Sequence, residues 1–159
     1  MTAEPLTDAP LTVSFELDGE AATVAVAEGE SLLEMLRDRW GQLSPKDGCS
    51  PQGQCGCCVV KINGQGVVSC ATKALKVEGK HVVTNEGLSD DERTLIARCF
   101  ATAGGVQCGF CIPGFVSRTS ALLEKNASPT RDDIGTAPAF DVALASHARR
   151  SSARSCARG

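Results

Sequence analysis

The chain has 159 residues, a net charge of −3 and an ordinary apolar content of 42%. This length fits one modest domain or two small ones, and the slight negative charge excludes a broad basic surface for nucleic acid. Nine cysteines are many for a chain of a reducing compartment such as the cytosol, the location expected below. Disulfides are rare in such compartments, so the cysteine content favours metal ligation.

Two features of the chain set its expected compartment. The longest apolar stretches are far shorter than the roughly 20 residues of a membrane-spanning helix. Residues 1–10 are acidic and contain no basic stretch followed by an apolar one, so they do not resemble a secretion signal. We therefore expect a cytoplasmic protein without a membrane span and with a flexible N-terminus at 1–10.

Alternation of apolar and polar residues predicts two β-hairpins in the first half of the chain. Asp18-Gly19 and Asn63-Gly64 are the residue pairs that favour tight turns between antiparallel strands. One further strand is expected before the chain changes character near residue 86. The predicted strands lie within residues 11–17, 22–26, 58–62, 67–70 and 76–84.

Capping patterns mark the expected helices. Ser31 and Ser89 are each followed three residues later by glutamate, the signature of a helix N-terminus. Trp40 is expected to pack in the core, and Phe115, Leu122 and Leu123 supply an apolar face to a later helix. The predicted helices cover residues 31–40, 90–103 and 113–125, with another starting at Thr130.

Four of the cysteines within residues 49–70 are candidate ligands of one site: Cys49, Cys55, Cys58 and Cys70. A Cys-x2-Cys pair turns two sulfurs to one side of a loop, and the second hairpin returns the last cysteine to the same place. Glycines at 48, 53 and 56 let backbone amides approach inorganic sulfide, which a Cβ would obstruct. The pattern predicts four thiolates around a [2Fe–2S] cluster.

Zinc is an alternative metal for the same cysteines. Structural zinc sites usually combine two closely spaced cysteine pairs, whereas this group has one pair and two single cysteines. A zinc-binding module without redox activity therefore stays open at this point. Cys57, the fifth thiol of the motif, is expected to be a small buried residue that points away from the site.

Two cysteine-dense segments carry a resemblance to a known family. Residues 47–60, DGCSPQGQCGCCVV, resemble the cluster loop of the iron–sulfur subunit of molybdenum hydroxylases. That family includes xanthine dehydrogenases, aldehyde oxidoreductases and aerobic carbon monoxide dehydrogenases. Residues 107–115, QCGFCIPGF, are similar to its second signature, and 126–134 also resembles it. The likeness covers residues 11–134.

The resemblance implies an α+β protein that carries two cofactor sites. A plant-ferredoxin-like β-grasp domain at 11–86 would precede a small helical domain at 87–134, which has four helices in relatives. Each domain binds one [2Fe–2S] cluster in the family. Carried over by position, the first site would use Cys49, Cys55, Cys58 and Cys70, the second Cys108 and Cys111, and Gln107 would lie near the molybdopterin.

The same resemblance implies an electron-transfer subunit of an oxidoreductase. In the family, substrate is oxidised on a large subunit that binds molybdopterin, and electrons pass through the clusters to FAD, usually on a medium subunit. We expect no catalytic residue on this chain, because no Ser/His/Asp set or carboxylate pair stands out. A free-standing [2Fe–2S] carrier without such partners is the other redox interpretation.

The sequence departs from the family after Ile134. Relatives have a Cys-Arg-Cys motif there that completes the second site, whereas the only later cysteine here is Cys156. The ending, rich in Ala, Arg and Ser, fits either a reading-frame shift or a divergence that abandoned the second cluster. We therefore expect a poorly ordered tail at 135–159 and a second site that is empty or loosely occupied.

Overall fold

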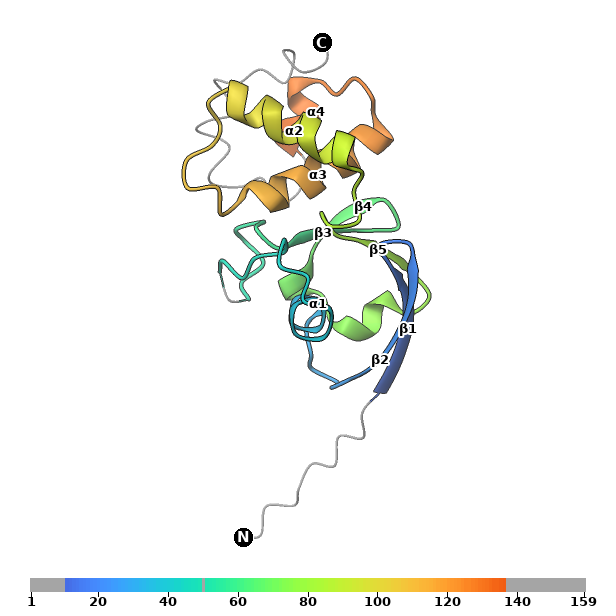
Figure 1. Ribbon diagram of the computed structural model, residues 1–159. Helices are drawn as coiled ribbons and strands as arrows, with labels where there is room; N and C mark the ends of the chain where they lie inside the picture. Colours follow the sequence, from blue (N-terminus) through green and yellow to red (C-terminus); the bar gives the residue numbers. More distant parts are fainter. Residues whose placement is uncertain (1–10, 50, 137–159) are drawn as a thin grey trace, which may run out of the picture.

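The structure, a computed structural model, describes residues 11–49 and 51–136. A mixed sheet with one helix is followed by a group of three helices (Figure 1). Residues 1–10 and 137–159 lie outside the described part of the chain. The predictions of a flexible N-terminus and of a poorly ordered tail, with Cys156 in it, therefore remain predictions.

The sheet has five strands in the order β2-β1-β5-β3-β4. Strand β5 is the link between two hairpins, because it pairs parallel with β1 and antiparallel with β3. All five predicted strands are present, although the second and the fourth each begin two residues earlier than expected. The fourth strand also ends at residue 68, and the fifth covers only residues 81–83 of the expected 76–84, which begins in a 3-10 turn. Their bounds are β1 (Leu11–Leu17), β2 (Glu20–Val26), β3 (Val59–Ile62), β4 (Gln65–Val68) and β5 (His81–Val83).

Both hairpin turns adopt the geometry that their sequence predicts. Asp18 and Gly19 have φ angles of 52° and 90°, and Asn63 and Gly64 have φ angles of 48° and 74°. Two consecutive positive φ angles match the right-handed twist of the flanking strands. The second turn matters for the metal site, because it sends β4 back along β3 toward the cysteine loop.

Helix α1 (Leu32–Trp40) supplies one side of the main core. Leu32, Met35 and Leu36 are buried against strand residues that include Val13 and Phe15. The Trp40 ring packs edge-on against Phe15, with centroids 5.4 Å apart, so its predicted core role is confirmed. Two short 3-10 turns, η1 (Ser69–Ala71) and η2 (Ala74–Val77), connect β4 to β5.

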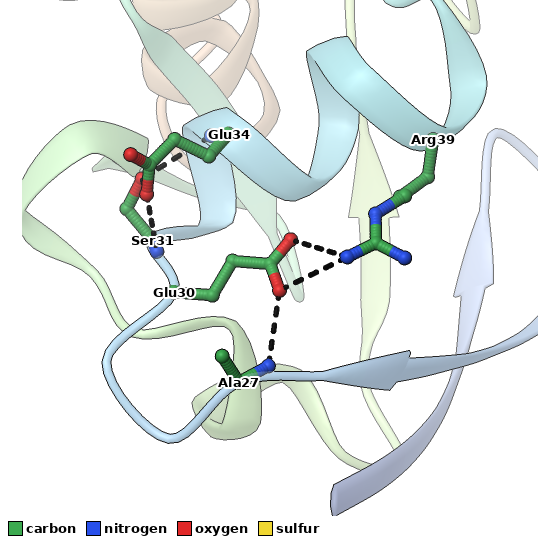
Figure 2. Close-up of polar contacts among 5 residues, drawn as sticks. All are labelled: Ala27, Glu30, Ser31, Glu34 and Arg39. Carbon is green, nitrogen blue, oxygen red and sulfur yellow. Dashed lines mark hydrogen bonds and ion pairs between the residues drawn. The ribbon is translucent and has the colours of Figure 1, made fainter. Parts of the chain in front are cut away.

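The N-terminus of α1 is closed by the predicted capping box (Figure 2). The Ser31 hydroxyl accepts a hydrogen bond from the Glu34 amide at 3.2 Å, and the Glu34 carboxylate accepts one from the Ser31 amide at 2.9 Å. Beside it, Glu30 accepts a bond from the Ala27 amide and pairs with Arg39. These bonds fix the start of the helix that leads into the cysteine loop.

Three helices form the second half: α2 (Asp90–Thr102), α3 (Ile112–Lys125) and α4 (Arg131–Thr136). Their predicted starts are confirmed, since Ser89 caps α2 and Thr130 exchanges hydrogen bonds with Asp133 at α4. Among the described residues, no helix is both long and apolar enough to cross a membrane.

The predicted apolar face of α3 is confirmed only in part. The Phe115 ring stacks on Phe100 with centroids 5.7 Å apart, whereas Leu123 is exposed. The face that packs on the sheet instead includes Ser117, Arg118 and Ser120, all buried. The reason lies in the partner surface. Strand β3 presents Lys61, whose buried ammonium donates to the Ser120 hydroxyl at 2.9 Å and pairs with Glu124, so α3 must offer polar groups there.

We predict that Ser31→Ala lowers the free energy of unfolding by about 1 kcal/mol. The substitution removes the hydroxyl that accepts a hydrogen bond from the Glu34 amide at the start of α1. Chemical denaturation of the purified protein measures this change. Ser128→Ala, at an exposed serine after α3, is the matched control and is expected to leave stability within about 0.5 kcal/mol. Equal destabilisation by both variants would contradict the capping role.

Candidate metal centre

The cysteine loop connects α1 to β3 and curls back on itself at two glycines. Gly53 and Gly56 have φ angles of 69° and 70°, which side chains with a Cβ rarely adopt. The Val59 amide donates to the Gly56 carbonyl, and the Lys46 amide donates to the Cys57 carbonyl at 3.0 Å. The loop is therefore shaped by backbone bonds, with its amides turned inward.

The loop brings the four predicted ligands together as two thiol pairs. The side chains of Cys49 and Cys55 contact each other, and the side chains of Cys58 and Cys70 do the same. The pairs adjoin, since Cys49 also lies close to Cys70. Cys58 ends the loop just before β3, and Cys70 returns on η1 after β4, as the second hairpin predicted.

Backbone amides surround these sulfurs. The Cys49 sulfur accepts hydrogen bonds from the amides of Cys55, Gln54 and Gln52, which lower the pKa of its thiol to about 7. The amide of Cys57 donates to Cys55, and that of Gly53 donates to Cys70. Amide hydrogen bonds to sulfur favour the thiolate, which is the form that ligates iron.

The two pairs differ in burial. Cys58 and Cys70 are only 1% and 5% exposed and pack with Leu33 and Val68. Burial raises the pKa of the Cys70 thiol to about 12, so this side of the site favours uncharged thiols until a metal binds. Cys49 and Cys55 are half-buried, so they form the side of the site that faces solvent.

This donor set fits a [2Fe–2S] cluster. Such a cluster takes four cysteines, two on each iron, and two adjoining thiol pairs provide them. The amides that point inward would donate hydrogen bonds to the sulfurs of a bound cluster and so stabilise their negative charge. Over residues 11–49 and 51–136, no three His, Cys, Asp or Glu side chains are arranged to hold a single metal ion.

Cys57 does not behave as predicted. It is buried, as expected, but its side chain contacts that of Cys55 instead of pointing away from the site. Burial raises the pKa of the Cys57 thiol to about 12, which keeps it protonated. The missing side chain of Gly48 leaves room for this thiol, since a Cβ there would be 3.3 Å from the Cys57 sulfur.

The second cysteine motif lies beside the first loop, at the start of α3. Cys111 is the residue before the helix and is half-buried, whereas Gln107 and Cys108 are exposed on the α2–α3 loop. The structure therefore places these three predicted residues on one loop, with Cys111 near Cys57. Cys99 is half-buried on α2.

Sequence reasoning missed the contact that joins the two motifs. Gly114, in the first turn of α3, lies so close to the cysteine loop that a Cβ there would be 2.1 Å from the Gly56 carbonyl oxygen. It would also lie 3.0 Å from Cys57 Cα. Pro113 is a residue type that favours a helix start, but sequence spacing gives no sign that the glycine after it must contact another loop.

Two family models match the chain. One is described as a "2Fe-2S iron-sulfur cluster binding domain" and covers residues 15–95. The other is described as a "[2Fe-2S] binding domain" and covers residues 84–141. Among curated proteins, the nicotinate dehydrogenase small FeS subunit of Eubacterium barkeri is 39% identical over 128 residues, which is 80% of this chain and 81% of the relative.

Solved structures show the same likeness. Quinoline 2-oxidoreductase from Pseudomonas putida 86 matches with a TM-score of 0.73 and 28% identity, over 94% of this chain and 98% of that one. The aldehyde oxidoreductase from Desulfovibrio gigas matches with a TM-score of 0.69 and 34% identity. That match covers 78% of this chain but 14% of the other, so the fold there is part of a longer chain.

We predict that Gly114→Ala destabilises the protein by about 1–3 kcal/mol, because the methyl group forces α3 away from the Gly56 carbonyl. The loss outweighs the gain of about 1 kcal/mol that alanine normally brings inside a helix. Chemical denaturation and the rate of iron loss to a chelator measure the effect. Gly29→Ala is the control, since a Cβ there meets no atom within 4 Å; similar behaviour of both variants would refute the close-contact argument.

Proposed function

Because the chain belongs to the small iron–sulfur subunits of the molybdenum hydroxylase family, we propose that Cys49, Cys55, Cys58 and Cys70 hold its first [2Fe–2S] cluster. The contacts between side chains support one iron on Cys49 and Cys55 and the other on Cys58 and Cys70. The single observation that carries this proposal is that four thiols lie together as two neighbouring pairs, with backbone amides that donate hydrogen bonds to their sulfurs.

The chain is an electron-transfer subunit of an oxidoreductase. When bound, a [2Fe–2S] cluster supplies a site that accepts and returns one electron at a time. The residues of this chain hold the thiolates, donate amide hydrogen bonds to sulfur and keep water from the Cys58 and Cys70 side. These are the features by which a protein tunes a cluster's potential.

The relatives favour this role over the two alternatives. They are small subunits or parts of larger oxidoreductases, which favours a subunit over a free-standing carrier. Two matches to [2Fe–2S]-binding families favour iron–sulfur over zinc. We propose partners of two kinds: a large subunit that binds molybdopterin and delivers electrons, and a medium subunit that binds FAD and receives them. A cytoplasmic location is part of the same proposal.

We also propose the division into a ferredoxin-like domain at 11–86 and a helical domain from 87 onward. It is supported by the element order, since every strand precedes residue 84 and α2, α3 and α4 follow residue 89. The side chain of Asn85 joins the two halves. Its Nδ2 group donates to the Pro113 carbonyl at 2.9 Å, and its Oδ1 accepts a hydrogen bond from the Ser117 hydroxyl at 2.8 Å.

The second cluster site is proposed at Cys108 and Cys111, with Gln107 directed to the pterin of the partner. Support comes from the match of the second family model over this loop and from the position of Cys111 near Cys57. After Cys111 the chain has one cysteine, Cys156, outside the described residues. We therefore propose that the second cluster is absent or only loosely held.

We predict that Cys58→Ala removes the first cluster, because one iron keeps a single protein ligand in a buried site. Cys57→Ala is the matched control at the adjacent thiol, and it is expected to retain two irons and two sulfides per chain. Iron and sulfide analysis of protein purified without air measures both variants. Cluster loss from Cys57→Ala to the same extent would contradict the ligand assignment.

For the unmodified protein we expect two irons per chain and, after reduction with dithionite, one S = 1/2 spin by low-temperature EPR. Two distinct signals with four irons would contradict an empty second site and show that Cys108 and Cys111 have found further ligands. Protein without iron would contradict the first site. Zinc in place of iron, measured in the same sample, would instead support a zinc-binding module without redox activity.

A further inference from the structure

Phe110 belongs to the second cysteine motif, but its ring lies at the first site. A Cβ at Gly48 would be 3.2 Å from Cε1 of Phe110, 3.0 Å from the Cys55 sulfur and 3.3 Å from the Cys57 sulfur. Gly48 directly precedes the ligand Cys49. The ring and the two sulfurs therefore line one small gap that exists because residue 48 has no side chain.

The position of Phe110 follows from how α3 begins. Gly109 has a φ of 82°, and the Ile112 amide donates to the Gly109 carbonyl at 3.1 Å, so the residues between them form a tight turn. The first turn of α3 contacts the Gly56 backbone directly, because Gly114 has no side chain to separate them. Figure 1 shows the start of α3 beside the cysteine loop. This position of α3 places the Phe110 ring, just before the helix, beside Gly48.

Phe110 covers the side of the site that is open to solvent. Cys58 and Cys70 are buried under Leu33 and Val68, whereas Cys49 and Cys55 are half-buried. Phe110 is 47% exposed, which fits a ring with one face toward the loop and the other toward water. On the Cys55 side, the ring thus stands between the sulfurs and solvent.

We propose that Phe110 shields the Cys55 side of the first [2Fe–2S] cluster from water and thereby lowers the reduction potential of that cluster. Reduction adds one electron to a centre whose thiolates and sulfides already make it negative. Water stabilises the added charge, so excluding water disfavours the reduced form. The inference rests on the proposed first site and adds a residue from the second motif to its environment.

The test is the midpoint potential of the first cluster in the full chain, from titration with dithionite followed by EPR. For Phe110→Ala we expect the ratio of reduced to oxidised cluster, at a fixed solution potential, to rise about three- to tenfold, which corresponds to roughly 30–60 mV. Phe110→Leu leaves a smaller apolar cover, so the potential should also rise, but by less than in Phe110→Ala. Leu95→Ala removes an exposed apolar side chain from α2 and is expected to leave the potential unchanged.

Three results would overturn the inference. One is an unchanged potential in Phe110→Ala with a full complement of iron. Another is an equal shift in Leu95→Ala, which would indicate a general effect of surface changes. If Phe110→Ala loses its cluster, Phe110→Leu decides, and a potential at or below that of the unmodified protein counts against shielding. A cluster-free unmodified protein would instead refute the proposed function itself.

Discussion

The first turn of α3 rests directly on the backbone of the cysteine loop, and the relation between the two cysteine motifs depends on this contact. No side chain fits between Gly114 and the Gly56 carbonyl, so the two backbones touch. Cys111 stands immediately before this turn, and Cys57 and Cys58 follow Gly56. A shift of α3 along the sheet would therefore separate the second motif from the first by the same amount.

Buried polar contacts hold α3 in that register. The Lys61 ammonium on β3 is enclosed by Ser120 and Glu124 of α3, and the Arg118 guanidinium donates to the Gly66 carbonyl on β4 at 2.9 Å. Burying two cations is costly unless each finds partners in one geometry. An apolar interface would tolerate sliding, whereas here a slip of one turn would leave both charges without their partners.

Much of the fold followed from local patterns, because the relevant interactions are local. The capping box at Ser31, the Asn63-Gly64 turn and the alternation in β1 involve residues close in sequence, so spacing alone predicts them. The polar face of α3 could not be predicted in that way. Arg118 and Ser120 are buried because of what β3 and β4 present to them, and a helical period carries no information about a partner surface.

In the candidate site, too, local features could be predicted from the sequence, and features that depend on distant contacts could not. Four thiols and glycines at fixed spacing predict a cluster loop, since the ligand number and the amide approach are properties of the loop itself. Phe110 and Cys111, which lie beside Gly48 and Cys57, come from a segment more than 50 residues further along the chain. Sequence spacing therefore predicted which thiols gather, and the structure adds which residues surround them.

The second motif has two physical roles that do not depend on each other. In the proposed second site, Cys108 and Cys111 would offer thiols to a cluster, and that role needs two further ligands, whereas the sequence after Ile134 has one cysteine, Cys156. Gly109, Phe110 and Gly114 instead shape a turn, cover Gly48 and seat α3, and they need only the described part of the chain. Loss of the second cluster would interrupt an electron path through the helical half. It would leave intact the packing by which the same segment encloses the first site.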